Sequence, residues 1–185
     1  MNTNVNTNDI DLSALLARLH ACSEARDWSA GKTLEQAWAE CPRGDWMLWL
    51  AGRLDVDRKL LVRAACQCAR LALPHVPAGE TRPLKALETA EAWTRGEATI
   101  EDVRAAASAA LAAVRAEADA SWACASAAAA WAASGAARRA ASAAGAAAGA
   151  WNAAWAAKLA ECADIVREHV SYELIAEAAR REAAK

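Results

Sequence analysis

The chain has no phenylalanine and a single tyrosine, whereas it has nine tryptophans among its 185 residues. Tryptophan must therefore supply most of the bulky aromatic packing, so we expect each Trp to be a core residue rather than a platform for a ligand. An excess of basic residues is also missing, because the formal net charge is −2. Neutralisation of phosphates by Lys and Arg supplies most non-specific affinity for nucleic acids, so nucleic acid is an unfavoured partner.

The sequence also lacks the residue patterns of a metal site or of an activated nucleophile. Cys66 and Cys68 have no second cysteine pair or histidine pair at the spacing of structural zinc. His20, His75 and His169 are isolated from one another, and no nucleophile motif or Gly-rich phosphate loop accompanies them. These observations predict a protein that is not an enzyme and that uses no metal and no cofactor.

The amino terminus does not have the basic and then apolar order of a signal peptide, and the six cysteines are dispersed along the chain. We therefore expect a cytoplasmic protein with reduced thiols. A length of 185 residues suits one domain. Residues 1–8 are polar and rich in asparagine, which predicts a disordered tail, and residues 9–185 are predicted to form a single all-α domain.

Capping signals and helical periodicity divide this domain into helices, and no segment has the pattern of a strand. The apolar residues of the segment GDWMLWLAGRL surround its axis almost completely, so we expect a short helix there that is buried on most sides. A helix over residues 57–73 is amphipathic, with Cys68 on its core face, and Pro74 ends it. The next helix begins at Pro83 and ends at Gly96. The predicted N-caps are Asp9 or Asp11, Thr33 with Gln36, Asp45, and Thr99 with Asp102.

Alanine dominates from Ile100 onward, and a tryptophan or an aliphatic residue recurs at helical spacing. This pattern predicts a long antiparallel Ala-rich helical hairpin packed against a Trp-rich N-terminal half, as one helical bundle. The uncharged runs 120–137 and 140–157, with the spacing of Gly145 and Gly149, also permit a membrane-active hairpin. We favour soluble packing, because both runs lack Leu, Ile and Val. An alanine surface packs equally well between two chains, so a homo-oligomer stays open.

The stretch PHVPAGETRPLKALETAEAWTRGEAT, residues 74–99, gathers most prolines and a dense mixture of charges around one Trp. One interpretation is structural, with Arg–carboxylate pairs that fasten this segment to neighbouring helices. The other is a charged contact surface around an aromatic anchor, as at protein interfaces. The candidate partner-binding residues are Glu80, Arg82, Glu88, Glu91, Trp93 and Arg95.

The order of several segments resembles the Imm-five-like immunity protein family, which is alanine-rich, helical and found in bacteria and phages. The resemblance covers about residues 20 to 172. It rests on CSEARDW, AWAECPRGDWMLWLAGRL, RAACQCARLALPHVPAGETRPLKALETAEAWTRGEAT and ECADIVREHV. Its most specific pieces are the GE-x-RP segment at residues 79–83 and the AW-x-RGEAT segment at residues 92–99.

This resemblance implies an all-helical, non-catalytic protein that neutralises a toxin by direct protein binding. The alternative is a phage-encoded anti-defence protein that inhibits a host defence enzyme or sequesters its nucleotide signal. A membrane-active hairpin is the third class. The expected partner is thus a toxin or a host defence protein, with a nucleotide signal as a further alternative.

Overall fold

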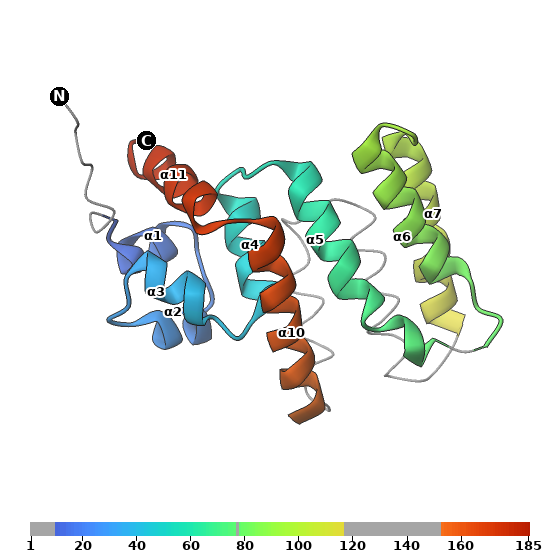
Figure 1. The fold of residues 1–185 in the computed structure, drawn as a ribbon, viewed down its shortest axis with the longest axis horizontal. Coiled ribbons are helices and arrows are strands. Elements are labelled where there is room, and N and C mark those ends of the chain that lie inside the picture. Colours follow the sequence, from blue (N-terminus) through green and yellow to red (C-terminus); the bar gives the residue numbers. More distant parts are fainter. Residues whose placement is uncertain (1–9, 77, 117–152) are drawn as a thin grey trace.

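The computed structural model describes residues 10–76, 78–116 and 153–185 (Figure 1). These residues form nine α-helices and one 3₁₀ helix, and none of them lies in a strand, so the all-α prediction is confirmed. The helices are α1 (Leu12–Arg18), α2 (Ser23–Ser29), α3 (Leu34–Glu40), α4 (Gly44–Arg53), α5 (Arg58–Arg70), α6 (Arg82–Arg95), α7 (Ile100–Ala116), α10 (Ala153–His169) and α11 (Tyr172–Ala183), with a 3₁₀ turn at Leu73–His75.

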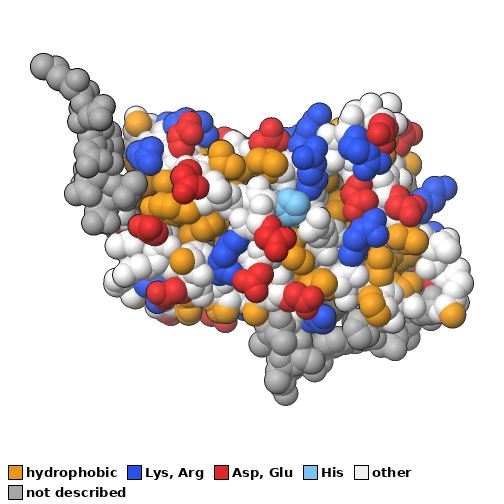
Figure 2. Space-filling view, viewed as in Figure 1, with side chains coloured by type: hydrophobic (Ala, Val, Ile, Leu, Met, Phe, Trp, Pro, Cys, Tyr) orange, Lys and Arg blue, Asp and Glu red, His pale blue; other side chains and the backbone are white. Residues whose placement is uncertain are grey.

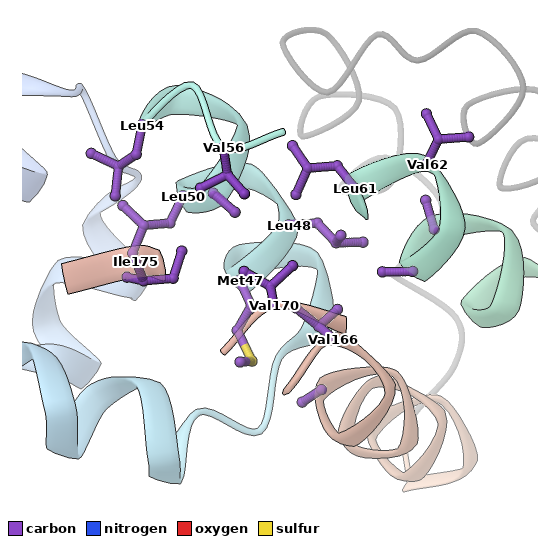
Figure 3. Close-up of a cluster of buried hydrophobic side chains, with 14 of the residues drawn as sticks. Met47, Leu48, Leu50, Leu54, Val56, Leu61, Val62, Val166, Val170 and Ile175 are labelled. Atoms are coloured by element: carbon purple, nitrogen blue, oxygen red, sulfur yellow. The ribbon is translucent and has the colours of Figure 1, made fainter. Parts of the chain in front are cut away.

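The helices from α4 to α7 follow one another across the molecule, each beside the next (Figure 1). Helix α10 lies against both α4 and α5, and α11 packs on α3 at the N-terminal end of the row. Figure 3 shows Met47 of α4 close to Val166 of α10 and to Val170, which directly follows this helix, with Leu50 and Ile175 beside them. The C-terminal helices therefore complete the core of the N-terminal half.

Among the described residues, the predicted N-caps are confirmed with one exception. Asp11 accepts a hydrogen bond from the Ala14 N–H at 3.0 Å. Capping boxes join Thr33 with Gln36 and Thr99 with Asp102 through reciprocal hydrogen bonds of 2.9 to 3.1 Å. The exception is Asp45, the cap predicted for α4.

Asp45 was predicted to cap a helix, and this was wrong. It is the second residue of α4, and its two carboxylate oxygens accept hydrogen bonds from Arg43 at 2.9 and 2.7 Å. A guanidinium fork suits bidentate pairing with a carboxylate, so the side chain engages Arg43 instead of the helix terminus. Helix α2 was not predicted at all, because its N-cap, Cys22, makes no side-chain capping bond and gives no signal in the sequence.

Helix α5 ends at Arg70, three residues before the predicted end, and the 3₁₀ turn carries Pro74. Both cysteines of α5 are partly or fully enclosed, since α6 and α10 cover two of its sides. Cys66 is fully buried toward α6, and burial raises the pKa of its thiol to about 12. Cys68, predicted to face the core, is half-buried toward α10, where its thiol donates to the Cys162 carbonyl at 3.6 Å. The amphipathic pattern of this segment predicts one buried face, so the sequence could not show that α5 is covered on two sides.

The ends of helix α6 follow the sequence closely. Pro83 lies at its second position rather than its first, where a missing N–H still costs nothing. Gly96 terminates the helix with a φ of 82°, in the left-handed region that favours glycine. The charged stretch at residues 74–99 is thus mainly one helix with its entry turn.

The described ends of the alanine-rich region pack on different neighbours. Helix α7 packs on α6, whereas α10 packs on α4 and α5. The large apolar residues of α4 and α5 offer α10 more area to bury than alanine would. Residues 117–152, which hold most of both uncharged runs, lie outside the described residues, as do residues 1–8. Within the described ranges, no helix is both long and apolar enough to cross a membrane.

The crossing of α10 over α4 depends on Gly44. A Cβ atom at this position would lie 2.6 Å from Cys162 Cβ, 2.7 Å from the Cys162 carbonyl carbon and 2.8 Å from the Ala163 nitrogen. Two of these atoms belong to the backbone of α10, so a side-chain rotation cannot relieve the contact. Only glycine permits this approach of the two helices.

We therefore expect Gly44→Ala to lower the free energy of unfolding by about 1 to 3 kcal/mol, because α10 must shift away from the buried core. Alanine has the better helix propensity, so this loss would oppose the local preference. Chemical denaturation monitored by far-UV circular dichroism measures the change. An unchanged or higher midpoint would contradict the close approach.

Candidate functional site

The first two candidate residues form a local pair at the start of α6. The Arg82 backbone N–H donates to Glu80 at 2.9 Å, and the Arg82 guanidinium also pairs with both carboxylate oxygens. The hydrogen bonds from the Arg82 side chain lower the pKa of Glu80 to about 2. This pair supports the structural interpretation, since it holds the turn that leads into the helix.

Three other candidates share one face of α6. Glu88, Glu91 and Arg95 are spaced three and four residues apart, which places them side by side along the helix. Glu88 is exposed, whereas Glu91 accepts two hydrogen bonds from Arg70 of α5, at 2.9 and 2.8 Å. This bidentate bond fastens α6 to α5, and it raises the pKa of the Arg70 guanidinium.

Trp93 does not belong to this face. It lies between about 140° and 200° around the helix from the three charged residues, at 100° per residue. Its side chain is half-buried and packs against the core. The structure thus does not bring Trp93 together with the charged candidates as an aromatic anchor, because the helical repeat turns it toward the protein interior.

A polar hollow of about 260 Å³ opens between α5, α6 and the end of α10. Figure 2 shows acidic and basic side chains interspersed over these helices. We use the name "polar hollow" for this depression throughout. Its lining residues are Arg63, Gln67, Glu91, Thr94, Arg95 and His169.

Two of these residues, Glu91 and Arg95, are among the sequence candidates, and the other four were missed. Arg63 and Gln67 were recognisable as neighbours on the polar face of α5, four residues apart. Nothing in the sequence shows which helix that face meets. His169 is more than a hundred residues from Arg63 along the chain, and only the packing of α10 on α5 brings it to the hollow.

The floor of the polar hollow is hydrogen-bonded. The Thr94 side chain is only 3% exposed, and its hydroxyl donates to the Glu91 carbonyl at 2.8 Å. Thr94 Oγ1 also accepts a hydrogen bond from Arg63 Nε at 3.3 Å. By contrast, the buried Nε2 of His169 has no hydrogen-bond partner among the described residues. An unpaired buried nitrogen costs free energy, which marks this edge of the hollow as incompletely satisfied.

The charges around the polar hollow are unequally paired. Glu91 is engaged by Arg70, and Arg95 pairs with Glu97 at 2.7 Å. The hydrogen bond between the latter two raises the pKa of Arg95 and lowers the pKa of Glu97. Arg63 has no carboxylate partner in the described ranges. It is therefore the lining arginine without a described carboxylate partner.

A second cavity, of about 50 Å³, lies among the tryptophans of the N-terminal helices. Trp28 and Trp46 border it with their rings 6.2 Å apart, and the Arg43 guanidinium lies 4.5 Å from the Trp46 ring. This space is apolar and far smaller than a typical ligand pocket of roughly 300 to 1,000 Å³. Trp28 and Trp46 are half-buried and pack against the hydrophobic core, in keeping with the packing role that the absence of phenylalanine predicts.

The described part of the chain contains no group of three or more His, Cys, Asp or Glu side chains that could hold a metal ion. Comparison of the whole chain with protein-family models, curated proteins and solved structures gives no match. The polar hollow must therefore be interpreted from its own geometry.

The Arg70–Glu91 pair generates a stability prediction. Glu91→Gln removes a bidentate pair that is about one-third exposed, so we expect a loss of about 0.5 to 1 kcal/mol after screening by solvent. Glu88→Gln is the matched control, three residues earlier on the same face, and should change stability by less than about 0.5 kcal/mol. Urea denaturation of both variants measures this difference. Equal effects would contradict a fastening role for Glu91.

The Glu80–Arg82 pair generates a pH prediction. The folded pKa of about 2 is below the ordinary value of 4.5, so the pair stabilises the fold above pH 4.5. This contribution decreases as the pH falls toward 2. Arg82→Gln should raise the pKa of Glu80 toward 4.5, which a ¹³C NMR titration of the side-chain carboxyl measures. A Glu80 pKa that stays near 2 in this variant would contradict the assignment.

Proposed function

We propose that the protein is a non-catalytic binding protein that acts in the cytoplasm and blocks a partner protein through the surface around the polar hollow. The favoured partner is a toxin, in keeping with the resemblance to immunity proteins. A host defence enzyme, blocked by a phage-encoded protein, is the alternative partner for the same surface.

The observation that carries this proposal is the arrangement of fixed and open charges on adjoining helices. Arg70, Glu91 and Thr94 are held in place by mutual hydrogen bonds, whereas Glu88 and Arg63 are exposed. Groups that are already ordered lose less conformational entropy when a partner docks. Interspersed charges of both signs also favour specificity, because a wrong partner meets like charges.

The size of the polar hollow favours a protein partner over a sequestered nucleotide. Pockets that enclose drug-sized ligands are typically 300 to 1,000 Å³, and about 260 Å³ is below that range. The half-buried Trp93 faces the core instead of the hollow, so it provides no stacking surface there. A hollow of this kind suits one side chain or one small group that a larger partner presents.

The test is affinity capture of candidate toxins and of lysate proteins with the tagged protein, read by mass spectrometry. We expect one stoichiometric protein partner. Glu88→Lys reverses an exposed charge beside the hollow, so it should weaken capture at least tenfold without changing the melting temperature.

The matched control for this experiment is Glu35→Lys. It makes the same charge reversal at an exposed position of α3, which lies at the other end of the molecule from α6 (Figure 1). Capture should be unaffected by the control. Equal weakening by both variants would point to non-specific electrostatics, and the absence of any stoichiometric partner would overturn the proposed function.

A further inference from the structure

We propose that the polar hollow is an oxyanion-binding site in which Arg63 holds a carboxylate or phosphate group. This inference deepens the proposed function, on which it rests for the source of the group: the partner would present it. The site itself can be tested without the partner.

Arg63 has the donors that such a site needs. Its only described hydrogen bond is the long one from Nε to Thr94 Oγ1, at 3.3 Å. The N–H groups of its two terminal nitrogens have no described partner. A planar guanidinium matches the spacing of two carboxylate or phosphate oxygens, so Arg63 can bind such a group in bidentate fashion.

Thr94 orients this guanidinium. Because its own proton is donated to the Glu91 carbonyl, its oxygen is left to accept from Arg63 Nε. The hydroxyl is buried in the floor of the hollow, so it fixes the inner edge of the Arg63 side chain. The Arg63 residue as a whole is exposed to solvent.

The other lining residues supply additional donors. Gln67 follows Arg63 by one helical turn and contributes an amide. Arg95 approaches from α6 and adds a second positive charge. His169 borders the hollow from α10, and its Nε2 is the buried polar atom without a described partner. A bound oxyanion would give His169 and the terminal nitrogens of Arg63 an acceptor that the described residues do not provide.

Glu91 is the one carboxylate that lines the hollow, and its charge opposes an anion. Both of its oxygens accept hydrogen bonds from Arg70, which compensates that charge locally. Arg95 is likewise paired with Glu97, so Arg63 is the lining charge that no described carboxylate compensates. A volume of about 260 Å³ is ample for a single carboxylate or phosphate group.

The experiment is a titration of the ¹⁵N-labelled full-length protein with inorganic phosphate at constant ionic strength. The Nε–Hε resonances of the arginines are observed by NMR. We expect a saturable shift of the Arg63 signal, with a dissociation constant on the order of millimolar, as for one small anion on an open site. A non-saturating drift of all arginine signals together would overturn the site.

Variants show whether Arg63 is responsible. In Arg63→Gln, the backbone amide shifts of Gln67 and Thr94 should lose their phosphate response, with affinity at least tenfold lower. Arg63→Lys should bind with intermediate affinity, because it keeps the charge but not the fork. Arg58→Gln removes an exposed charge from the first turn of the same helix and should bind phosphate normally. Equal losses in Arg58→Gln and Arg63→Gln would mean charge screening alone and would overturn the proposal.

A parallel titration with acetate distinguishes the two chemical sources. Tighter binding of acetate indicates a partner carboxylate, and tighter binding of phosphate indicates a phosphorylated group; either result supports an oxyanion site. The capture experiment then separates the two proposals. If phosphate binds at Arg63 but no partner is captured, the site stands and the proposed function fails. If a partner is captured equally by wild type and Arg63→Gln, the proposed function stands and the role of the site in it fails.

Discussion

The close crossing of α10 over α4 and α5 is the constraint on which the rest of the structure depends. It requires Gly44, because the backbone of α10 at Cys162 and Ala163 occupies the place of a side chain. Small residues of all three helices are fully buried, including Ala51 of α4, Ala64 of α5 and Ala163 of α10. Alanine has little apolar area, so alanine-rich helices gain stability mainly where backbones approach closely or meet larger residues. Helix α10 approaches the backbone of α4 closely at Gly44 and also packs against larger apolar residues.

A polar contact in the C-terminal half of α10 also holds this helix in place. Arg167 donates hydrogen bonds to the carbonyl oxygens of Trp38 and Cys41, at 3.0 and 2.5 Å. These carbonyls lie at the end of α3, where backbone acceptors have no partner within the helix. One side chain thus links a C-terminal helix to a segment about 130 residues earlier. By fixing α10, it also fixes the position of His169 beside the polar hollow.

The charged groups of the molecule divide into two kinds by what they contact. The Arg70–Glu91 and Arg43–Asp45 pairs use both carboxylate oxygens and hold specific elements in place. Pairs between exposed residues within one helix, such as Glu177 with Arg181, contribute little. Arg63 belongs to neither kind, since it lacks a described carboxylate partner. A charge without a carboxylate partner is a candidate for an interaction outside the fold.

The sequence by itself determined the class of the fold and many of its local boundaries. The caps at Asp11, Thr33 and Thr99 and the terminator at Gly96 depend on neighbours within four residues, so their physical cause is visible in the sequence. The missed helix α2 and the wrong cap at Asp45 show the limit of this reasoning. Where a cap is absent, or where a nearby arginine competes for the carboxylate, the local pattern no longer decides.

Only the tertiary structure decided which faces meet. The sequence placed Glu91 and Arg95 in a charged segment, but the approach of α5 supplied Arg63 and the approach of α10 supplied His169. An amphipathic pattern predicts that one face of a helix is buried. It does not predict which other helix covers that face, because many apolar surfaces bury a similar area. The partner of each helix is selected by fit, such as the space left at Gly44, and that fit exists only once distant segments are packed together.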